Sequence, residues 1–479
     1  MTDGDDMKDR PRPLSGRDLT TGSIPRHLIA FSLPMLAGSA LQTAYSFVNA
    51  IWVGQFLGKT ALAAVTVSFP VVFVMIALGA GLTLATNILI SQHYGARDLP
   101  AVRRVVASST ALMGVLALAL TFVGELLTPH ILRAMDTPPD VLPLAAQYMR
   151  IFLLSLPLGF GLFLTRSMLQ GVGDSTTPLY FQAAALGLNT VLDPLLMFGW
   201  LGLPALGLNG TAWATVIAQG LALAALVAML RRRRNLVAPT LERGLLDWST
   251  AWTTIRIGIP SAVQQSLISI GMVFVTGIIN GYGADATAAF GAASRVDQLA
   301  FMPALTLSMA ISTLAGQNIG AGRQHRVREV FWWGCALSGG ITLICSVLVV
   351  ALPRTMLRIF TNDATVIALG AHYLRIVGAC YLFFAVMFVS NGIINGSGRT
   401  LVTTLISLVS LWVVRVPTAW WLSRRLGSID GVWYAIAASF GVSMTVSLLY
   451  YASGRWRKSV ARRPPPTPEQ LIGEQTGEA

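Results

Sequence analysis

Charge is scarce in this chain. Of its 479 residues only 11% are Asp, Glu, Lys or Arg, whereas 54% are hydrophobic, and the mean hydropathy is +0.64. A soluble domain carries about 25% charged residues, so this composition cannot cover a globular surface in water. The sequence therefore predicts a polytopic membrane protein.

Cysteines and enzyme motifs are also sparse. The three cysteines, Cys335, Cys345 and Cys380, lie in or beside apolar segments without metal-type spacing, so neither a disulfide framework nor a metal site is expected. The sequence has no Gly-x-x-x-x-Gly-Lys-Ser/Thr phosphate loop, which argues against ATP-driven transport. No His/Glu cluster or Ser/His/Asp set occurs in the apolar runs, so we expect no enzyme and no cofactor.

The amino-terminal segment lacks the pattern of a cleavable leader. Residues 1–27 mix Asp with Arg and have no short apolar core followed by a small-residue cleavage site, so we expect the first apolar helix to act as the insertion signal. The formal charge of +13 comes mostly from Lys and Arg in short loops and tails. There they act as topology signals, and we do not expect nucleic-acid binding.

Twelve apolar runs are long enough to cross a bilayer. They cover residues 28–54, 61–93, 101–126, 141–168, 177–201, 207–230, 249–281, 286–318, 327–351, 367–394, 401–423 and 431–453. An even number of spans places both tails on one side. Lys and Arg concentrate in the tails and in alternate loops, so the positive-inside bias predicts a multi-pass protein of the cell (inner) membrane with cytoplasmic termini.

The sequence repeats itself at a spacing close to 225 residues. Gln92-His93-Tyr94-Gly95-Ala96 matches Gln317-Asn318-Ile319-Gly320-Ala321, and Gln170-Gly171-Val172-Gly173 matches Asn395-Gly396-Ser397-Gly398. Six spans per repeat give both halves the same orientation, related by an axis along the membrane normal. We therefore predict an all-α fold of twelve transmembrane helices in two pseudo-symmetric six-helix bundles. The expected parts are a tail (1–27), an N-terminal bundle (28–230), a basic linker (231–248), a C-terminal bundle (249–453) and a second tail (454–479).

The run at 177–201 holds the most informative polar residues. Asn189 and Asp193 are four positions apart and so share one helix face. A carboxylate at bilayer depth costs roughly 2.5–3.5 kcal/mol on insertion scales, so it is expected to face a cavity and to bind an ion or a substrate. The structural alternative is that Asp193 caps a half-helix whose first residue is Pro194.

Several motifs together resemble the MATE (multidrug and toxic compound extrusion) transporters, with the closest similarity to their DinF-like prokaryotic branch. The motifs are the end of the first helix at 48–54, the two Gln-x-x-Gly-Ala turns, the 170–176 turn and Asn189-x-x-x-Asp193-Pro194. The similarity extends over about 28–453. It implies a V-shaped pair of bundles that exports a cationic amphiphile in exchange for protons or sodium ions.

The resemblance also implies a coupling site in the N-terminal bundle. Its residues correspond here to Gln42, Tyr45, Asn189, Asp193 and Thr215, and the position of the family's first-helix acid is Asn49. Residues 42, 45 and 49 form one stripe of the first helix, which independently predicts that they face the same interior. With Asp193 as the single carboxylate, we expect one-proton coupling or altered ion use.

The substrate is expected to contact Asp193 and an adaptable apolar wall. Candidate wall residues are Phe47, Met197, Phe198, Phe301 and Met302, although each fits bundle packing equally well. The acids of the NorM-like branch are missing from the seventh and tenth helices, and the seventh carries Gln264 and Gln265, which either contact substrate or bond between helices. Arg415 is interpreted as structural, with repulsion of cations from that bundle as the alternative. Arg295 and Asp297 are interpreted as a local ion pair or as a sign that the eighth span starts later.

Two other functions fit parts of this pattern. A lipid-linked-sugar flippase of related fold would need a cationic cavity, and no basic residue is evident at the depth of Asp193. A non-transporting receptor or scaffold would need sizeable domains outside the membrane, whereas the loops here are short. We therefore expect a monomeric efflux transporter whose partners are a small-molecule cation and the lipid bilayer.

Overall fold

The computed structural model describes residues 16–135, 137–202, 204–457 and 459, and within them the chain is helical and has no strand. The first half contains α1 (Ile24–Phe56), α2 (Gly58–Gly95), α3 (Leu99–Ala134), α4 (Leu142–Leu154), α5 (Leu156–Gly171), α6 (Thr176–Phe198), η1 (Trp200–Gly202), α7 (Leu208–Arg232) and η2 (Arg243–Leu245). The second half contains α8 (Trp248–Asn280), α9 (Ala284–Gly320), α10 (Gln324–Ala351), α11 (Pro353–Arg358), α12 (Ala364–Gly378), α13 (Tyr381–Gly396), α14 (Thr400–Leu408), η3 (Val409–Arg415), α15 (Val416–Leu426), α16 (Asp430–Ala452) and η4 (Arg455–Arg457).

The helices account for all twelve expected spans. Ten described helices are long and apolar enough to cross a membrane, and two bent pairs raise the number to twelve. The pairs are α4 with α5, bent by 42°, and α12 with α13, bent by 48°. The eleventh span is continuous from α14 through α15, with the π-helical turn η3 in its middle. The predicted all-α class is confirmed.

The two bends are equivalent in the two repeats, and each is stabilised in the same way. The Thr121 hydroxyl on α3 donates to the carbonyl of Leu153 at 3.1 Å. The Ser346 hydroxyl on α10 donates to the carbonyl of Gly378 at 2.7 Å. A break frees carbonyls that lipid cannot solvate, so a neighbouring hydroxyl is needed to satisfy them.

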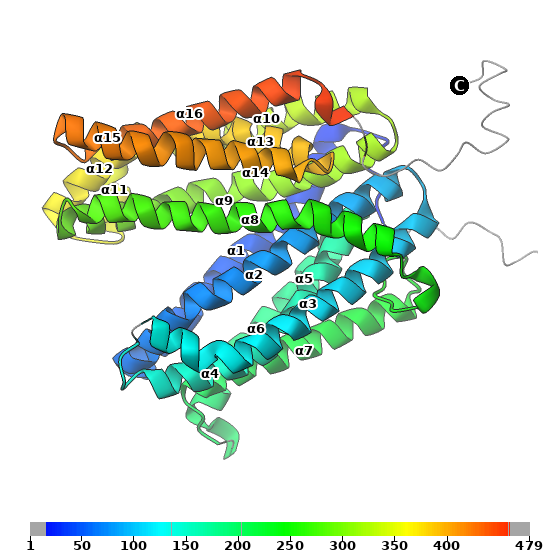
Figure 1. Cartoon of the computed structure of the whole chain (residues 1–479), viewed down its shortest axis with the longest axis horizontal. Coiled ribbons are helices and arrows are strands. Elements are labelled where there is room, and N and C mark those ends of the chain that lie inside the picture. The colour runs from blue at the N-terminus through cyan, green and yellow to red at the C-terminus, as the bar shows by residue number, and fades with distance from the viewer. Residues whose placement is uncertain (1–15, 136, 203, 458, 460–479) are drawn as a thin grey trace, which may run out of the picture.

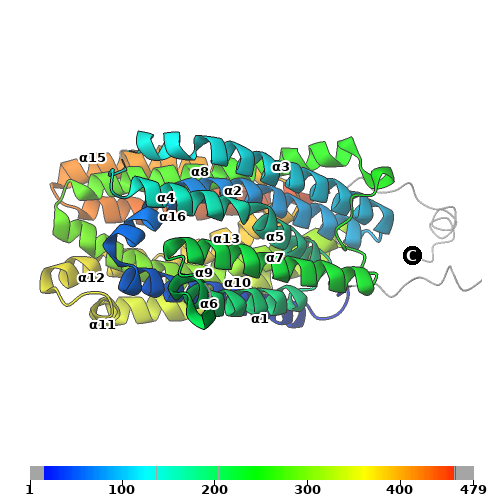
Figure 2. The same cartoon turned by 90° about the horizontal axis from the view of Figure 1, so that it is seen from below.

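The helices form two arms of a V (Figure 1), and in the perpendicular view of Figure 2 the two arms overlap. Helices α1 to α7 belong to one arm and α8 to α16 to the other. The arms converge at the end where the described chain begins, where the linker crosses and where α16 ends, and they diverge at the other end. The convergent end is called the closed end below.

Close approach at the closed end depends on two glycines. A Cβ built on Gly95 would lie 2.0 Å from the carbonyl oxygen of Gln317, and one built on Gly320 would lie 1.9 Å from that of Gln92. Any side chain would therefore separate the ends of α2 and α9. The Gln-x-x-Gly-Ala turns are thus one of the places where the two arms touch.

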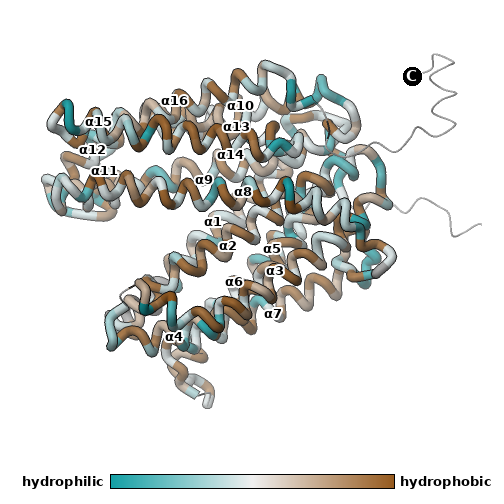
Figure 3. The backbone as a smooth tube through the Cα atoms, viewed as in Figure 1, coloured by the Kyte–Doolittle hydropathy of each residue, from teal (hydrophilic) through white to brown (hydrophobic). Residues whose placement is uncertain are grey.

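The outer faces of the arms are apolar, as a lipid-facing surface requires. Figure 3 shows hydrophobic residues along the helices and hydrophilic ones toward both ends. On α3, Val115, Leu118 and Phe122 are 67%, 64% and 66% exposed and occupy one stripe. In water such a stripe would be unfavourable, but in a bilayer it is the expected contact with acyl chains.

Candidate functional site

Asp193 lies inside the N-terminal arm on a continuous helix. Helix α6 runs through Pro194 to Phe198, so Asp193 does not cap a half-helix, and the structural alternative from the sequence is wrong. The proline only removes the N–H that would pair with the carbonyl of Thr190. The Asp193 side chain is 1% exposed, and neither carboxylate oxygen accepts a hydrogen bond. Among the described residues no Lys, Arg or His comes within 4.0 Å of it.

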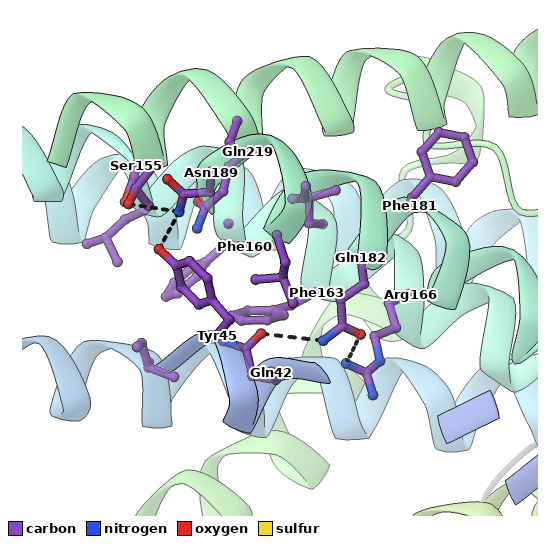
Figure 4. Close-up of a pocket in the computed structure, with 18 of the residues that line it drawn as sticks. Gln42, Tyr45, Ser155, Phe160, Phe163, Arg166, Phe181, Gln182, Asn189 and Gln219 are labelled. Atoms are coloured by element: carbon purple, nitrogen blue, oxygen red, sulfur yellow. Dashed lines mark hydrogen bonds between the residues drawn. The ribbon is translucent and has the colours of Figure 1, made fainter. Parts of the chain in front are cut away.

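Three helices meet around Asn189, one turn before Asp193. The Asn189 amide nitrogen donates to the Tyr45 hydroxyl of α1 at 2.5 Å and to the Thr215 hydroxyl of α7 at 3.4 Å. Figure 4 shows the first of these bonds, with the Tyr45 ring reaching from α1 toward Asn189. The structure thus brings together side chains that lie far apart in the sequence, and among the described residues the Asn189 amide oxygen has no hydrogen-bond donor.

A cavity of about 270 Å³ opens beside this group. The predicted residues that line it are Gln42, Tyr45, Asn49, Asn189 and Thr215. Aromatic rings form much of the remaining wall, among them Tyr148, Phe160 and Phe181. Asp193 is not in the lining itself but lies one helical turn beyond Asn189 on α6.

Four enclosed oxygens in this region have no hydrogen-bond donor among the described residues. They are both carboxylate oxygens of Asp193, the amide oxygen of Asn189 and the amide oxygen of Asn49. Buried acceptors are normally satisfied, and each one left unpaired costs free energy. A proton or an oxygen-coordinated cation would remove that cost. The group is therefore chemically suited to binding a coupling ion.

A larger cleft of about 960 Å³ separates the two arms. Gln264, Gln265, Phe301 and Met302, all predicted to face substrate, line it. Gln264 also donates to the Ser407 hydroxyl at 2.6 Å, so it bonds between helices as well as facing the cleft. The two alternatives for this glutamine are therefore compatible.

Three predicted wall residues lie outside both cavities. Phe47 is 55% exposed because it follows Tyr45 by two positions, which is about 200° around the helix. Met197 is 2% exposed and lies where α7 approaches α6 at Gly210. Phe198 packs against the rings of Trp52 and Trp200. In this conformation their positions do not favour the predicted substrate contacts.

The C-terminal arm contains a charged group that the sequence analysis did not assign to a site. Asp297 on α9 accepts hydrogen bonds from the hydroxyls of Tyr373 and Tyr381. It forms no ion pair with Arg295, whose guanidinium carbon lies 5.9 Å from the ring centroid of Phe360. Because α9 begins at Ala284, the eighth span does not start later than expected. The criterion applied to Asp193, an acid within an apolar run, would have selected Asp297 too.

Two arginines lie in the walls of these cavities. Arg415, interpreted as structural, lines the cleft between the arms. Arg166 on α5 lines both the cleft and the smaller cavity, and the sequence analysis assigned it no role. Its position inside the run at 141–168 was the signal that could have identified it.

Comparison with known proteins identifies the fold and the family. The MatE family model matches residues 34–195 and again 260–421, which confirms the internal repeat. A probable multidrug resistance protein of Bacillus subtilis, YpnP, is 32% identical over 92% of this chain and 97% of its own length. A second protein of that organism, YoeA, is 32% identical over 95% of this chain and 99% of its own length.

A solved structure shares the same fold. A MOP superfamily transporter from Pyrococcus furiosus superimposes with a TM-score of 0.85 at 23% identity, covering 94% of this chain and 100% of that one. The two-arm arrangement around a central cleft is therefore an established architecture. Together with the two matches to one family model, these findings show that the chain belongs to the MatE family of multidrug and toxic compound extrusion transporters and is not an enzyme.

Proposed function

We propose that this chain exports amphiphilic organic cations in exchange for a proton or a sodium ion that binds at Asp193. The observation that carries the proposal is an enclosed carboxylate without any hydrogen-bond partner, placed directly behind a cavity lined by Tyr45 and Asn189. Such a group is unfavourable when charged and alone, so its occupancy must change with the conformation of the surrounding helices. Aromatic and methionine side chains in the cleft support an adaptable site for the exported compound.

Coupling requires that the affinity of Asp193 for the proton or sodium ion differs between the two open conformations. A proton or cation on Asp193 shifts the equilibrium between the two open conformations only by the amount that its affinity differs between them. By linkage, the exported compound must weaken the binding of the coupling ion by the same factor that the ion weakens the binding of the compound. We place the termini and the closed end in the cytoplasm of the cell membrane, so the conformation described here is open to the outside. A monomer suffices for this cycle.

The test compares Asp193→Asn with wild type in proteoliposomes loaded with ethidium. With an imposed pH or sodium gradient, wild type is expected to export the dye, and the variant is expected to lose the response to both gradients. Asp140→Asn, which changes an exposed loop carboxylate, is the matched control and should behave as wild type. Export by Asp193→Asn that still follows the gradient would refute the proposal. Loss of coupling in Asp297→Asn alone would place the coupling site in the other arm.

The same proteoliposomes distinguish efflux of a cation from the alternative function, a lipid flippase. A fluorescent lipid-linked pyrophosphate in the bilayer would be translocated by a flippase without any ion gradient. We expect no such movement.

A further inference from the structure

The charged side chains that line the cleft are not those of a simple cation site. Three charged residues are found in its lining, Arg166 from α5, Asp297 from α9 and Arg415 from η3. Two cations against one anion leave this surface with one net positive charge, and Asp193 lies outside the lining. A purely cationic guest therefore gains no net attraction from this surface, whereas a guest that also carries an anionic group does.

The carboxylate of Asp297 is already satisfied. Each of its oxygens accepts a hydrogen bond from a tyrosine hydroxyl, Tyr373 on one and Tyr381 on the other. Asp297 is only 7% exposed. In its ionised form Asp297 is a negative charge that makes a nearby buried arginine tolerable without occupying that arginine's donors.

Arg415 keeps most of its donors free. Its Nε donates to the Ser439 hydroxyl at 2.8 Å, and its guanidinium carbon lies 5.0 Å from the centroid of the Phe440 ring. No carboxylate among the described residues comes within 4.0 Å of it, and its terminal nitrogens bond to no described residue. They are not enclosed either. A guanidinium held by its Nε and by a ring presents its outer edge in the geometry that matches an oxyanion.

The π-helical turn η3 gives Arg415 its position. The turn covers Val409–Arg415 and lies in the middle of the eleventh span. A turn of this kind widens the helix by one residue and re-aims the side chains that follow it, and such turns occur often at functional sites. Here the last residue of the turn is the arginine that lines the cleft.

Arg166 offers a second guanidinium from the opposite arm. One terminal nitrogen donates to the Gln182 amide oxygen at 3.1 Å, as Figure 4 shows, and no ion pair involves it among the described residues. The Gln182 amide in turn donates to the carbonyl of Gly38 at 3.2 Å. Arg166 is thus positioned by neutral groups and keeps its charge available to the cleft.

We propose that Arg415 is the residue that binds the carboxylate or similar oxyanion of an aromatic exported compound, and that Arg166 on the opposite arm attracts the same group. The aromatic body packs against Phe301 and Phe440, which line the cleft near Arg415. This inference rests on the proposed function only in treating the cleft as the route of the exported compound. It gives a role to the two arginines of the cleft, which binding of a cation alone does not explain.

The test uses two dyes that differ in one group, a rhodamine with a free carboxylate and the methyl ester of the same dye. Binding to purified full-length protein in detergent is measured by fluorescence anisotropy. Wild type should bind the free acid more tightly than the ester. Arg415→Gln should weaken binding of the acid by about tenfold or more, as expected for loss of a charge-assisted hydrogen bond, and change binding of the ester less than about twofold.

The matched control is Arg424→Gln. Arg424 lies on the same span, is exposed and also stacks on a ring, that of Trp420 at 4.1 Å, but it lines neither cavity. Its substitution should leave both affinities unchanged. Arg415→Lys, which keeps the charge and loses the two-pronged geometry, should fall between wild type and Arg415→Gln for the acid.

An equal loss of acid and ester binding in a folded Arg415→Gln protein would overturn the inference, as would equal binding of both dyes by wild type. If Arg415→Gln does not fold, Arg415→Lys and Arg166→Gln are used for the test. The inference is then overturned if neither variant weakens binding of the acid more than binding of the ester. The experiment needs no transport. Failure of ion coupling at Asp193 would therefore leave the binding result intact, so the two proposals fail separately.

Discussion

Gln92 and Gln317 each donate a hydrogen bond to a glycine carbonyl of the opposite arm, at equivalent positions of the closed end. The Gln92 amide on α2 donates to the carbonyl of Gly396 at 2.7 Å, and the Gln317 amide on α9 donates to the carbonyl of Gly171 at 3.0 Å. Both the donors and the acceptors are separated by 225 positions, the period of the repeat. Each arm therefore holds the other by the same contact, related by the pseudo-twofold axis.

The closed end is also held by residues 16–23, a segment that precedes α1 and is called the strap below. The backbone N–H of Leu19 donates to the Gln317 amide oxygen at 3.0 Å, and the Asn318 amide donates to the carbonyl of Leu19 at 3.2 Å. Leu19 is fully buried in an apolar cluster with residues of α9 and α10. In the proposed transport cycle, opening of the closed end would have to break the contacts between the arms at Gln92 and Gln317.

We expect Gly95→Ala and Gly320→Ala to open the closed end. A methyl group at either position would overlap a backbone carbonyl of the other arm, which cannot move aside as a side chain can. Both variants should increase maleimide labelling of a single cysteine placed at Leu19 in a chain whose native cysteines are replaced, and both should lower the export rate several-fold. Gly114→Ala on α3, where nothing lies within 4 Å, is the control and should do neither.

Tyr45→Phe should impair ion coupling without unfolding the protein. The change removes the hydroxyl that accepts from Asn189, so the amide retains only the longer bond to Thr215. We expect the concentration of protons or sodium ions needed for half-maximal export to rise by about fivefold, equivalent to one hydrogen bond of about 1 kcal/mol. Tyr180→Phe, an exposed tyrosine on α6, should have no effect. A Tyr45→Phe protein with wild-type ion dependence would contradict the coupling role of this contact.

Asn49→Asp should add a second titratable group to the N-terminal arm. The Asn49 amide oxygen is enclosed and accepts no hydrogen bond, so a carboxyl group of the same size can replace the amide. We expect the number of protons exchanged per exported molecule to rise, measured from the shift of the reversal potential with pH. An unchanged stoichiometry and ion preference would show that the missing acid is immaterial to coupling.

Asp247→Ala should destabilise the start of α8. The Asp247 carboxylate accepts from the backbone N–H groups of Ser249 and Thr250 at 3.2 Å and 3.0 Å, the arrangement of a helix N-cap. Removing such a cap costs about 1 kcal/mol, whereas Asn retains the acceptor. Asp247→Ala should therefore lower the melting temperature in detergent more than Asp247→Asn. Equal effects would mean that the charge, not the cap, stabilises this junction.

The strap at 16–23 should loosen only in acid. Partial burial acts to raise the pKa of Asp18, but hydrogen bonds from Thr20 and the charges of Arg97 and Arg323 outweigh it, and the pKa lies below its usual value. A carboxylate with a lowered folded-state pKa stabilises the fold above its unfolded pKa of about 3.9, and this contribution is lost as the pH falls through the lower folded value.

Hydrogen exchange measured by mass spectrometry checks this prediction. In wild type the protection of the 16–23 segment should be constant at neutral pH and should decrease below about pH 4. In Asp18→Asn it should be lower at neutral pH and should vary little with pH. A decrease with the same midpoint in both proteins would assign the effect to other groups.

Much of the fold follows from local pattern in the sequence. Apolar run length determines the twelve spans, and the period of about 225 residues determines the two equivalent halves. Helical spacing also places Gln42, Tyr45 and Asn49 on one stripe, and all three line the same cavity. These features depend on residues close together in the chain, where the geometry of the helix alone fixes which side chains share a face.

The tertiary structure decided the rest, because the rotation and closeness of packed helices depend on side chains far apart in the sequence. Asp297 is separated from Tyr373 by 76 positions and from Tyr381 by 84, and no local pattern predicts that both hydroxyls reach it. Likewise, Arg166 and Arg415 become walls of one cleft only when the two arms are placed together. The sequence thus determined the spans, the repeat and the buried acid, and packing between the arms decided which charges an exported molecule meets.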